Sequence, residues 1–97
     1  MDLKNMTWDE KNDLAWDPST PEDILRELAH DTSAEIRWHV ALNKKSSGNL
    51  LITLFEYEKS LRSPCPEVIM YLYSNSNCPA FIRSVIETLF MEILING

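Results

Sequence analysis

Glycine is scarce in this chain, with only Gly48 and Gly97 among its 97 residues. A loop that cradles phosphate needs several glycines, because its backbone must approach the ligand closely. No serine lies in the glycine-flanked pattern of a hydrolase nucleophile, and no nucleophile–base motif is present. The sequence therefore predicts a protein that is not an enzyme, with no catalytic residue and no cofactor.

Cysteine and histidine are also few. Cys65 and Cys78 are the only cysteines, too few for a disulfide framework. A helix predicted between them separates them by roughly 15 Å, whereas a disulfide needs Cα atoms within about 7 Å, so we expect two free thiols. His30 and His39 lack the partner four residues away that a helical zinc site requires. No metal site is predicted.

Long apolar runs and clusters of basic residues are missing as well. No run reaches the roughly 18 apolar residues of a membrane span, and the first residues lack the basic-then-apolar order of a secretory signal. We therefore expect a cytoplasmic protein with no membrane contact. Beyond Lys44-Lys45 no basic cluster exists, and binding to a phosphate backbone needs one. Nucleic acid is an unfavoured partner.

Acidic residues, by contrast, are abundant and unevenly placed. Residues 1–35 hold ten acids against three bases, a net charge of −7, within a chain whose net charge is −6. The excess fits either a solvated acidic face or a docking surface for a basic protein. Under the second interpretation the candidate binding residues are Glu22, Asp23 and Glu27.

Apolar residues recur at helical spacing, and no segment shows the alternation of a strand. Helix starts are marked by a capping box at Thr7 and Glu10 and by proline after Thr20. The sequence predicts an all-α fold with six helices. Their expected ranges are 7–16, 21–30, 33–42, 48–61, 65–74 and 79–95.

The helices form an internal repeat. A shift of 26 residues aligns Asp17 with Asn43 and Leu28 with Leu54, and a shift of 32 aligns Asn43 with Asn75. Units of this length cannot bury their apolar faces alone and must stack. We expect a single domain over 1–97, with a truncated unit at about 1–16 and further units at about 17–42, 43–74 and 75–97.

Two runs carry a family resemblance over residues 14–43. Asp17-Pro-Ser-Thr-Pro, continuing through Leu25, Leu28 and Ala29 to Asp31, together with Glu35-Ile-Arg-Trp-His-Val-Ala-Leu-Asn43, resembles the leucine-rich repeat variant, a relative of HEAT and armadillo repeats. The resemblance implies a short right-handed α–α superhelix of about three stacked helix pairs, and a role in macromolecular contact. The iron–sulfur cluster of some relatives does not carry over, because no cysteine precedes Cys65.

Asp31 and Arg37 match the family's acidic and Val-Arg elements, and we assign them a structural role. The expectation is a charge-assisted bond from Arg37 back to the loop before its helix. At a shift of 32 they align with Ser63 and Ile69, so acid and base vanish together, as partners would.

Two aromatic residues are further binding candidates. Trp38 is one of three tryptophans, which are either core and end-cap residues or exposed anchors for a partner. Tyr57 lies in 56–61, the stretch by which helix 48–61 exceeds helix 21–30. That stretch is either an insertion without function or a docking ridge.

The last predicted helix, 79–95, is apolar on more than one face. A repeat stack normally ends in a polar surface, so Phe90 and Leu94 are candidates for self-association or for a partner. The favoured function is thus a non-enzymatic protein-interaction module with an unidentified, basic protein partner and a homodimer as a compatible state. The alternative is a HEAT-like nucleic-acid-binding or DNA-modifying domain.

Overall fold

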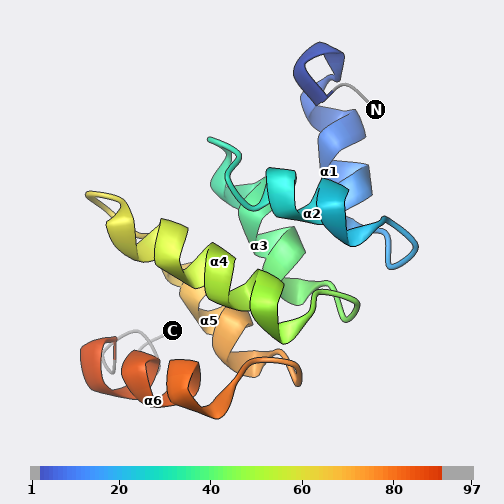
Figure 1. Ribbon diagram of the computed structural model, residues 1–97. Coiled ribbons are helices and arrows are strands. Elements are labelled where there is room, and N and C mark those ends of the chain that lie inside the picture. The colour runs from blue at the N-terminus through green and yellow to red at the C-terminus, as the bar shows by residue number, and fades with distance from the viewer. Residues whose placement is uncertain (1–2, 91–97) are drawn as a thin grey trace.

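The computed structural model describes residues 3–90. Over that range it contains a short 3₁₀ turn, six α-helices and no strand, so the predicted all-α class is confirmed (Figure 1). The elements are η1 (Leu3–Asn5), α1 (Trp8–Trp16), α2 (Glu22–Leu28), α3 (Ala34–Leu42), α4 (Gly48–Ser60), α5 (Pro66–Ser74) and α6 (Ala80–Leu89).

Side-chain capping sets the starts of two helices, α1 and α4. Thr7 accepts from the Glu10 N–H at 3.1 Å while the Glu10 carboxylate accepts from the Thr7 N–H at 2.9 Å. Ser47 accepts from the Leu50 N–H at 3.1 Å and opens α4. These bonds satisfy donors that would otherwise be orphaned in the first turn.

Two predicted helix ends were wrong. α2 stops at Leu28, because the next N–H groups, of His30 and Asp31, bond three residues back and close a tight turn. α6 stops at Leu89, and Phe90 leaves helical geometry with φ −126° and ψ 28°. There the Phe90 ring packs edge-on against Phe55, with centroids 6.4 Å apart. The rest of the predicted range, 91–95, lies outside the described residues.

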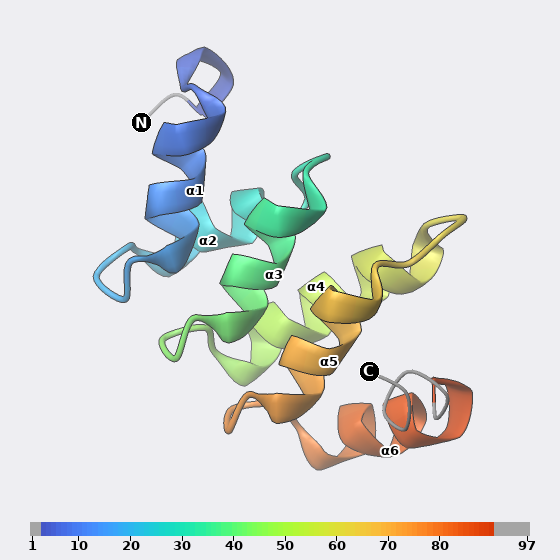
Figure 2. The ribbon, with the colours of Figure 1, turned by 180° about the vertical axis from the view of Figure 1, so that it is seen from behind.

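The helices lie in two layers. α1, α3 and α5 pack side by side, and α2 and α4 pack together over them. Seen from behind, the layer of α1, α3 and α5 faces the viewer (Figure 2). α6 packs against α5, at one end of the layer of α1, α3 and α5.

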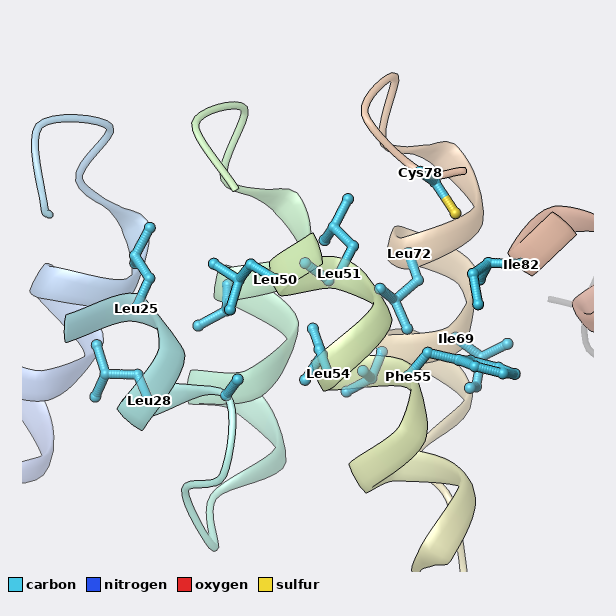
Figure 3. Packing of buried hydrophobic residues seen from close by; sticks show 14 of the residues in the cluster. Leu25, Leu28, Leu50, Leu51, Leu54, Phe55, Ile69, Leu72, Cys78 and Ile82 are labelled. Carbon is cyan, nitrogen blue, oxygen red and sulfur yellow. The ribbon is translucent and has the colours of Figure 1, made fainter. Parts of the chain in front are cut away.

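One apolar core joins the layers. Leucines of α2 and α4 point toward the helices beneath them, and α6 adds Ile82 at the far end (Figure 3). Full burial of one such side chain is worth about 1.5–3 kcal/mol. The fully buried members include Leu25, Leu28, Ile36, Val40, Leu50, Leu51, Leu54, Phe55, Val68, Ile69, Leu72 and Ile86.

The loops after α1, α3 and α5 share one hydrogen-bond pattern. Each begins at a C-cap residue, Asp17, Asn43 or Asn75, whose carbonyl accepts from the N–H three residues on at 3.1, 3.0 and 2.9 Å. The side-chain oxygen accepts from the N–H two residues on at 2.9, 2.9 and 2.8 Å. The pattern recurs at 26 and 32 residues, the registers at which the apolar residues align.

The two asparagines also join neighbouring loops. Asn43 Nδ2 donates to the carbonyls of Ala15 at 2.9 Å and Asp17 at 3.1 Å. Asn75 Nδ2 repeats this one unit later, to Ala41 at 2.7 Å and Asn43 at 3.2 Å. We call this series of Asp17, Asn43 and Asn75 the asparagine ladder. It fixes the spacing of α1, α3 and α5.

Arg83 of α6 ends the ladder. Its Nη2 donates to the Asn75 carbonyl at 2.9 Å, the bond that an asparagine side chain makes at the two earlier loops. Its guanidinium also lies 6.0 Å from the ring centroid of Tyr73. α6 is therefore tied to α5 by polar as well as apolar contacts.

Candidate protein-interaction surface

Arg37 lies at the centre of a buried polar cluster. Its Nη1 donates to the loop carbonyls of Asp31 at 2.8 Å and Thr32 at 3.2 Å. The carboxylate that it pairs with belongs to Glu58, through Nε at 2.8 Å and Nη2 at 3.2 Å. Asp31 thus contributes its main chain, and the expected side-chain pairing of Asp31 with Arg37 was wrong.

The Asp31 carboxylate has other partners. It accepts from Lys11 Nζ at 2.8 Å and from the Ser33 N–H at 2.9 Å. These bonds hold α1 against the loop before α3. Lys11 is thus the ion-pair partner of Asp31, and Glu58 is that of Arg37.

Glu58 was missed from the sequence. It is fully buried in α4 and also accepts from the Cys65 N–H at 2.7 Å. The available signal was its position, one turn beyond Leu54 and three residues after Phe55 on the apolar stripe of α4. The longer α4 therefore contributes Glu58 to an internal ion pair.

Tyr57 lies over the same cluster. The Arg37 guanidinium is 5.8 Å from its ring centroid, and His30 packs edge-on at 5.0 Å between centroids. A half-buried ring in these contacts shields the Arg37–Glu58 pair from water. The structure gives Tyr57 a packing role on the α2–α4 layer.

The three acids proposed for binding all lie on α2. Glu22 pairs with Arg26 at 3.1 Å, and hydrogen bonding from Ser47, then pairing with Arg26, lowers the pKa of Glu22. Asp23 and Glu27 are exposed beside a surface hollow of about 380 Å³ that His30 also lines. The α2 acids share one helix, and Trp38 lies in the other layer.

A second surface runs across α1, α3 and α5. These helices form the layer that faces the viewer in Figure 2, and they carry exposed and half-buried residues at equivalent repeat positions; we call this surface the odd-helix face. Its residues are Asp9, Asn12, Asp13, Trp16, Glu35, Trp38, His39, Leu42, Glu67, Met70, Tyr71 and Ser74.

Aromatic side chains are braced along the odd-helix face. Trp38 packs edge-on against Tyr71 of α5, with centroids 6.4 Å apart, and against His39 at 6.2 Å. His39 Nδ1 is 2.7 Å from Asn12 Oδ1 of α1. These contacts cross from helix to helix, so the face is a fixed surface and Trp38 is half-buried within it.

Next to these rings lies an open apolar hollow. It has a volume of about 320 Å³ and is lined by Trp16, Pro18, His39, Leu42, Asn43 and Lys44. Trp16 is 66% exposed and Leu42 46%. Large apolar side chains gathered at a hollow are typical of interaction surfaces.

Phe90 and Leu94, near the C-terminal end of the chain, are the residues predicted for self-association. Phe90 packs on Phe55 and is half-buried, so it is not a free surface residue. The exposed apolar residues of α6 are Phe81, at 59%, and Leu89, at 60%. Leu94 lies outside the described residues.

Chemistry-bearing groups are sparse in the part of the chain that the structure describes. Between residues 3 and 90 no three of its His, Cys, Asp or Glu side chains gather as metal ligands would. Cys65 and Cys78 are both free, and burial raises the pKa of each thiol. No helix among these residues is long and apolar enough to cross a membrane.

Comparison with known proteins adds no relative. No family model, no curated protein and no solved structure matches this chain.

Proposed function

We propose that this chain is a non-enzymatic protein-interaction module, built as a short right-handed α-solenoid of the leucine-rich-repeat-variant kind. The observation that carries the proposal is the odd-helix face, where braced aromatic rings adjoin a hollow with exposed Trp16 and Leu42. The recurring loops of the asparagine ladder support the stacked arrangement. Two free thiols suit a cytoplasmic location, where thiols stay reduced.

Photo-crosslinking tests this function. p-Benzoylphenylalanine at Leu42 should give discrete protein adducts in a lysate of the source cells, competed by excess unlabelled chain. The same residue at Lys45 is the control, because Lys45 is exposed on the adjoining loop but does not line the hollow. Equal adduct patterns at both positions, or no competed adduct, would contradict the proposal. Nuclease-sensitive adducts would support the nucleic-acid alternative.

Self-association through α6 is a compatible state. Phe81 and Leu89 lie eight residues apart on one exposed stripe of α6, and Val85 between them is half-buried against the core. Two-fold pairing is the commonest way to bury such a stripe. We propose Phe81 and Leu89 for this contact, because Phe90 is half-buried against Phe55.

We expect a weak dimer, with a Kd on the order of 100 µM, because few side chains are buried against the cost of association. Phe81→Glu with Leu89→Lys should abolish it and leave the helical content intact. Sedimentation equilibrium measures the change, with Ser84→Glu and Thr88→Lys as a control on the same helix. A wild-type chain that stays monomeric at several times that concentration would contradict the prediction.

A further inference from the structure

We infer that the odd-helix face binds a basic protein segment, in which arginine or lysine side chains flank an apolar anchor. The inference rests on the proposed function and names the partner's chemistry. It assigns the binding face to α1, α3 and α5 in place of the acidic helix α2.

The apolar part of the face favours a partner with an apolar anchor side chain. Trp16 and Leu42 are equivalent residues in successive units and line the same hollow of about 320 Å³. That volume holds a leucine or an aromatic side chain. Trp16 keeps 66% and Leu42 46% of its surface exposed to water, so covering them with an apolar side chain is favourable. Tryptophan is also the residue most enriched at the centre of interfaces.

The negative charge of the face favours arginine or lysine side chains on both sides of the partner's apolar anchor. Asp9, Glu35 and Glu67 occupy equivalent positions in the first turns of α1, α3 and α5, and Asp13 lies one turn from Trp16. Within residues 3–90 none of these four carboxylates forms an ion pair, although Glu67 accepts from the Cys65 thiol at 3.2 Å. The helix dipoles also favour acids in the first turns. Their alignment nevertheless gives one face an uncompensated negative field.

The α2 surface is charged differently. There Glu22 is paired with Arg26, and Arg26 also donates to Thr53 at 3.0 Å. The hollow beside Asp23 and Glu27 therefore contains a cation already in place. On the odd-helix face the cation that lines the hollow is Lys44, which is exposed and forms no ion pair among residues 3–90.

The rings add a second attraction for cations. Trp38 and Tyr71 are held edge-to-face across two helices, so their positions are set before a partner arrives. Arginine packs favourably on such rings. The axes of α1 and α5 lie roughly 20 Å apart, and an extended segment of about seven residues covers that distance. Nucleic acid is disfavoured, because its phosphates would face the same carboxylates.

Fluorescence anisotropy with a labelled synthetic peptide tests the inference. The peptide has about twelve residues, with arginine pairs flanking leucines, and it is added to the full chain. We expect saturable binding that weakens as salt rises, since rim charges act through screened long-range attraction. A matched peptide with citrulline in place of arginine, and one with serine in place of leucine, should each bind about tenfold more weakly.

Chain variants locate the site. Trp16→Ser should weaken binding about 30-fold, as expected for a central anchor. Asp13→Asn with Glu35→Gln should weaken it about tenfold, whereas Asp23→Asn with Glu27→Gln makes the same change in net charge on α2 and should alter it less than twofold. Lys44→Glu should tighten binding about threefold. Thermal melts by circular dichroism check that each variant folds.

Three results would overturn the inference. They are no saturable peptide binding, equal losses from the odd-helix and α2 charge pairs, and tighter binding of a single-stranded oligonucleotide than of the peptide. If the peptide fails while Leu42 still crosslinks to a protein, the proposed function stands and only the partner's chemistry is wrong. If both fail, the interaction role is wrong as well.

Discussion

Replacing Arg37 by methionine is expected to lower the free energy of unfolding by about 3–5 kcal/mol. The Glu58 carboxylate would then be fully buried without its cation, and an unpaired buried charge is costly. A chain of this size has a total stability on the order of 5–15 kcal/mol, so the variant should be close to unfolding. Urea denaturation followed by circular dichroism measures the loss.

The double variant Arg37→Met with Glu58→Leu distinguishes the cost of leaving one buried charge unpaired from the cost of changing the two side chains. It should recover most of the lost stability, because it removes both buried charges together. Arg26→Met, which breaks the exposed pair with Glu22, is the control and should cost less than about 1 kcal/mol. Additive losses for Arg37 and Glu58 would contradict the pairing. A coupling of Arg37 with Asp31 as large as that with Glu58 would do so too.

The second large effect is expected at Asn75. Asn75→Ala should cost about 2–4 kcal/mol, because the carbonyls of Ala41 and Asn43 lose a shared buried donor. Asn75→Asp should be at least as damaging, since a carboxylate would face the same two carbonyl oxygens. The free energy of unfolding from urea titration is the readout.

Asp17→Asn is the matched control for this series. Asp17 begins the same kind of loop, but its side chain only accepts, from the N–H and the hydroxyl of Ser19. The Asn Oδ1 atom can accept in its place, so we expect little change in stability. Asp17→Ala removes that acceptor and so tests the turn alone. A loss in Asp17→Ala comparable to that in Asn75→Ala would show that the loop turns, and not the ladder, carry the effect.

The all-α class and most helix bounds could be predicted from the sequence, because both depend on local pattern. Caps such as Thr7 act within one turn, and the alignment of Asp17, Asn43 and Asn75 reflects a loop that each unit forms on its own. The residues that this alignment brings into register are the ones that form the asparagine ladder. The sequence does not show that Asn43 and Asn75 donate to carbonyls at the end of the neighbouring helix. These bonds become evident only when the loops lie side by side.

Of the contacts of Arg37, the sequence predicted the bond to the loop but not the carboxylate that pairs with it. Arg37 reaches the loop before its helix, as its position near Asp31 indicates. Its carboxylate partner is 21 residues away on α4, and nothing local distinguishes Glu58 from an exposed acid except its place on an apolar stripe. Pairing between layers depends on how the helices cross, which the sequence pattern does not state.

The face that we propose for binding differs from the acidic residues of α2 for the same reason. Counting charges along the chain favours α2, where three acids lie close in sequence. The odd-helix face gathers Asp9, Glu35 and Glu67 from three helices. These carboxylates therefore share one face only because α1, α3 and α5 pack side by side. Similarly, Phe90 looked free at the end of an apolar helix but turns inward to Phe55 where α6 ends.

Amide chemical shifts of the ¹⁵N-labelled chain, recorded while the arginine–leucine peptide is added, test most directly whether the odd-helix face binds the partner. The largest saturable shifts should fall on α1 and α3, at Asp13, the Trp16 indole N–H, His39 and Leu42, with smaller ones at Tyr71. Shifts centred on Asp23 and Glu27 of α2, or shifts that never saturate, would contradict the assignment of this face.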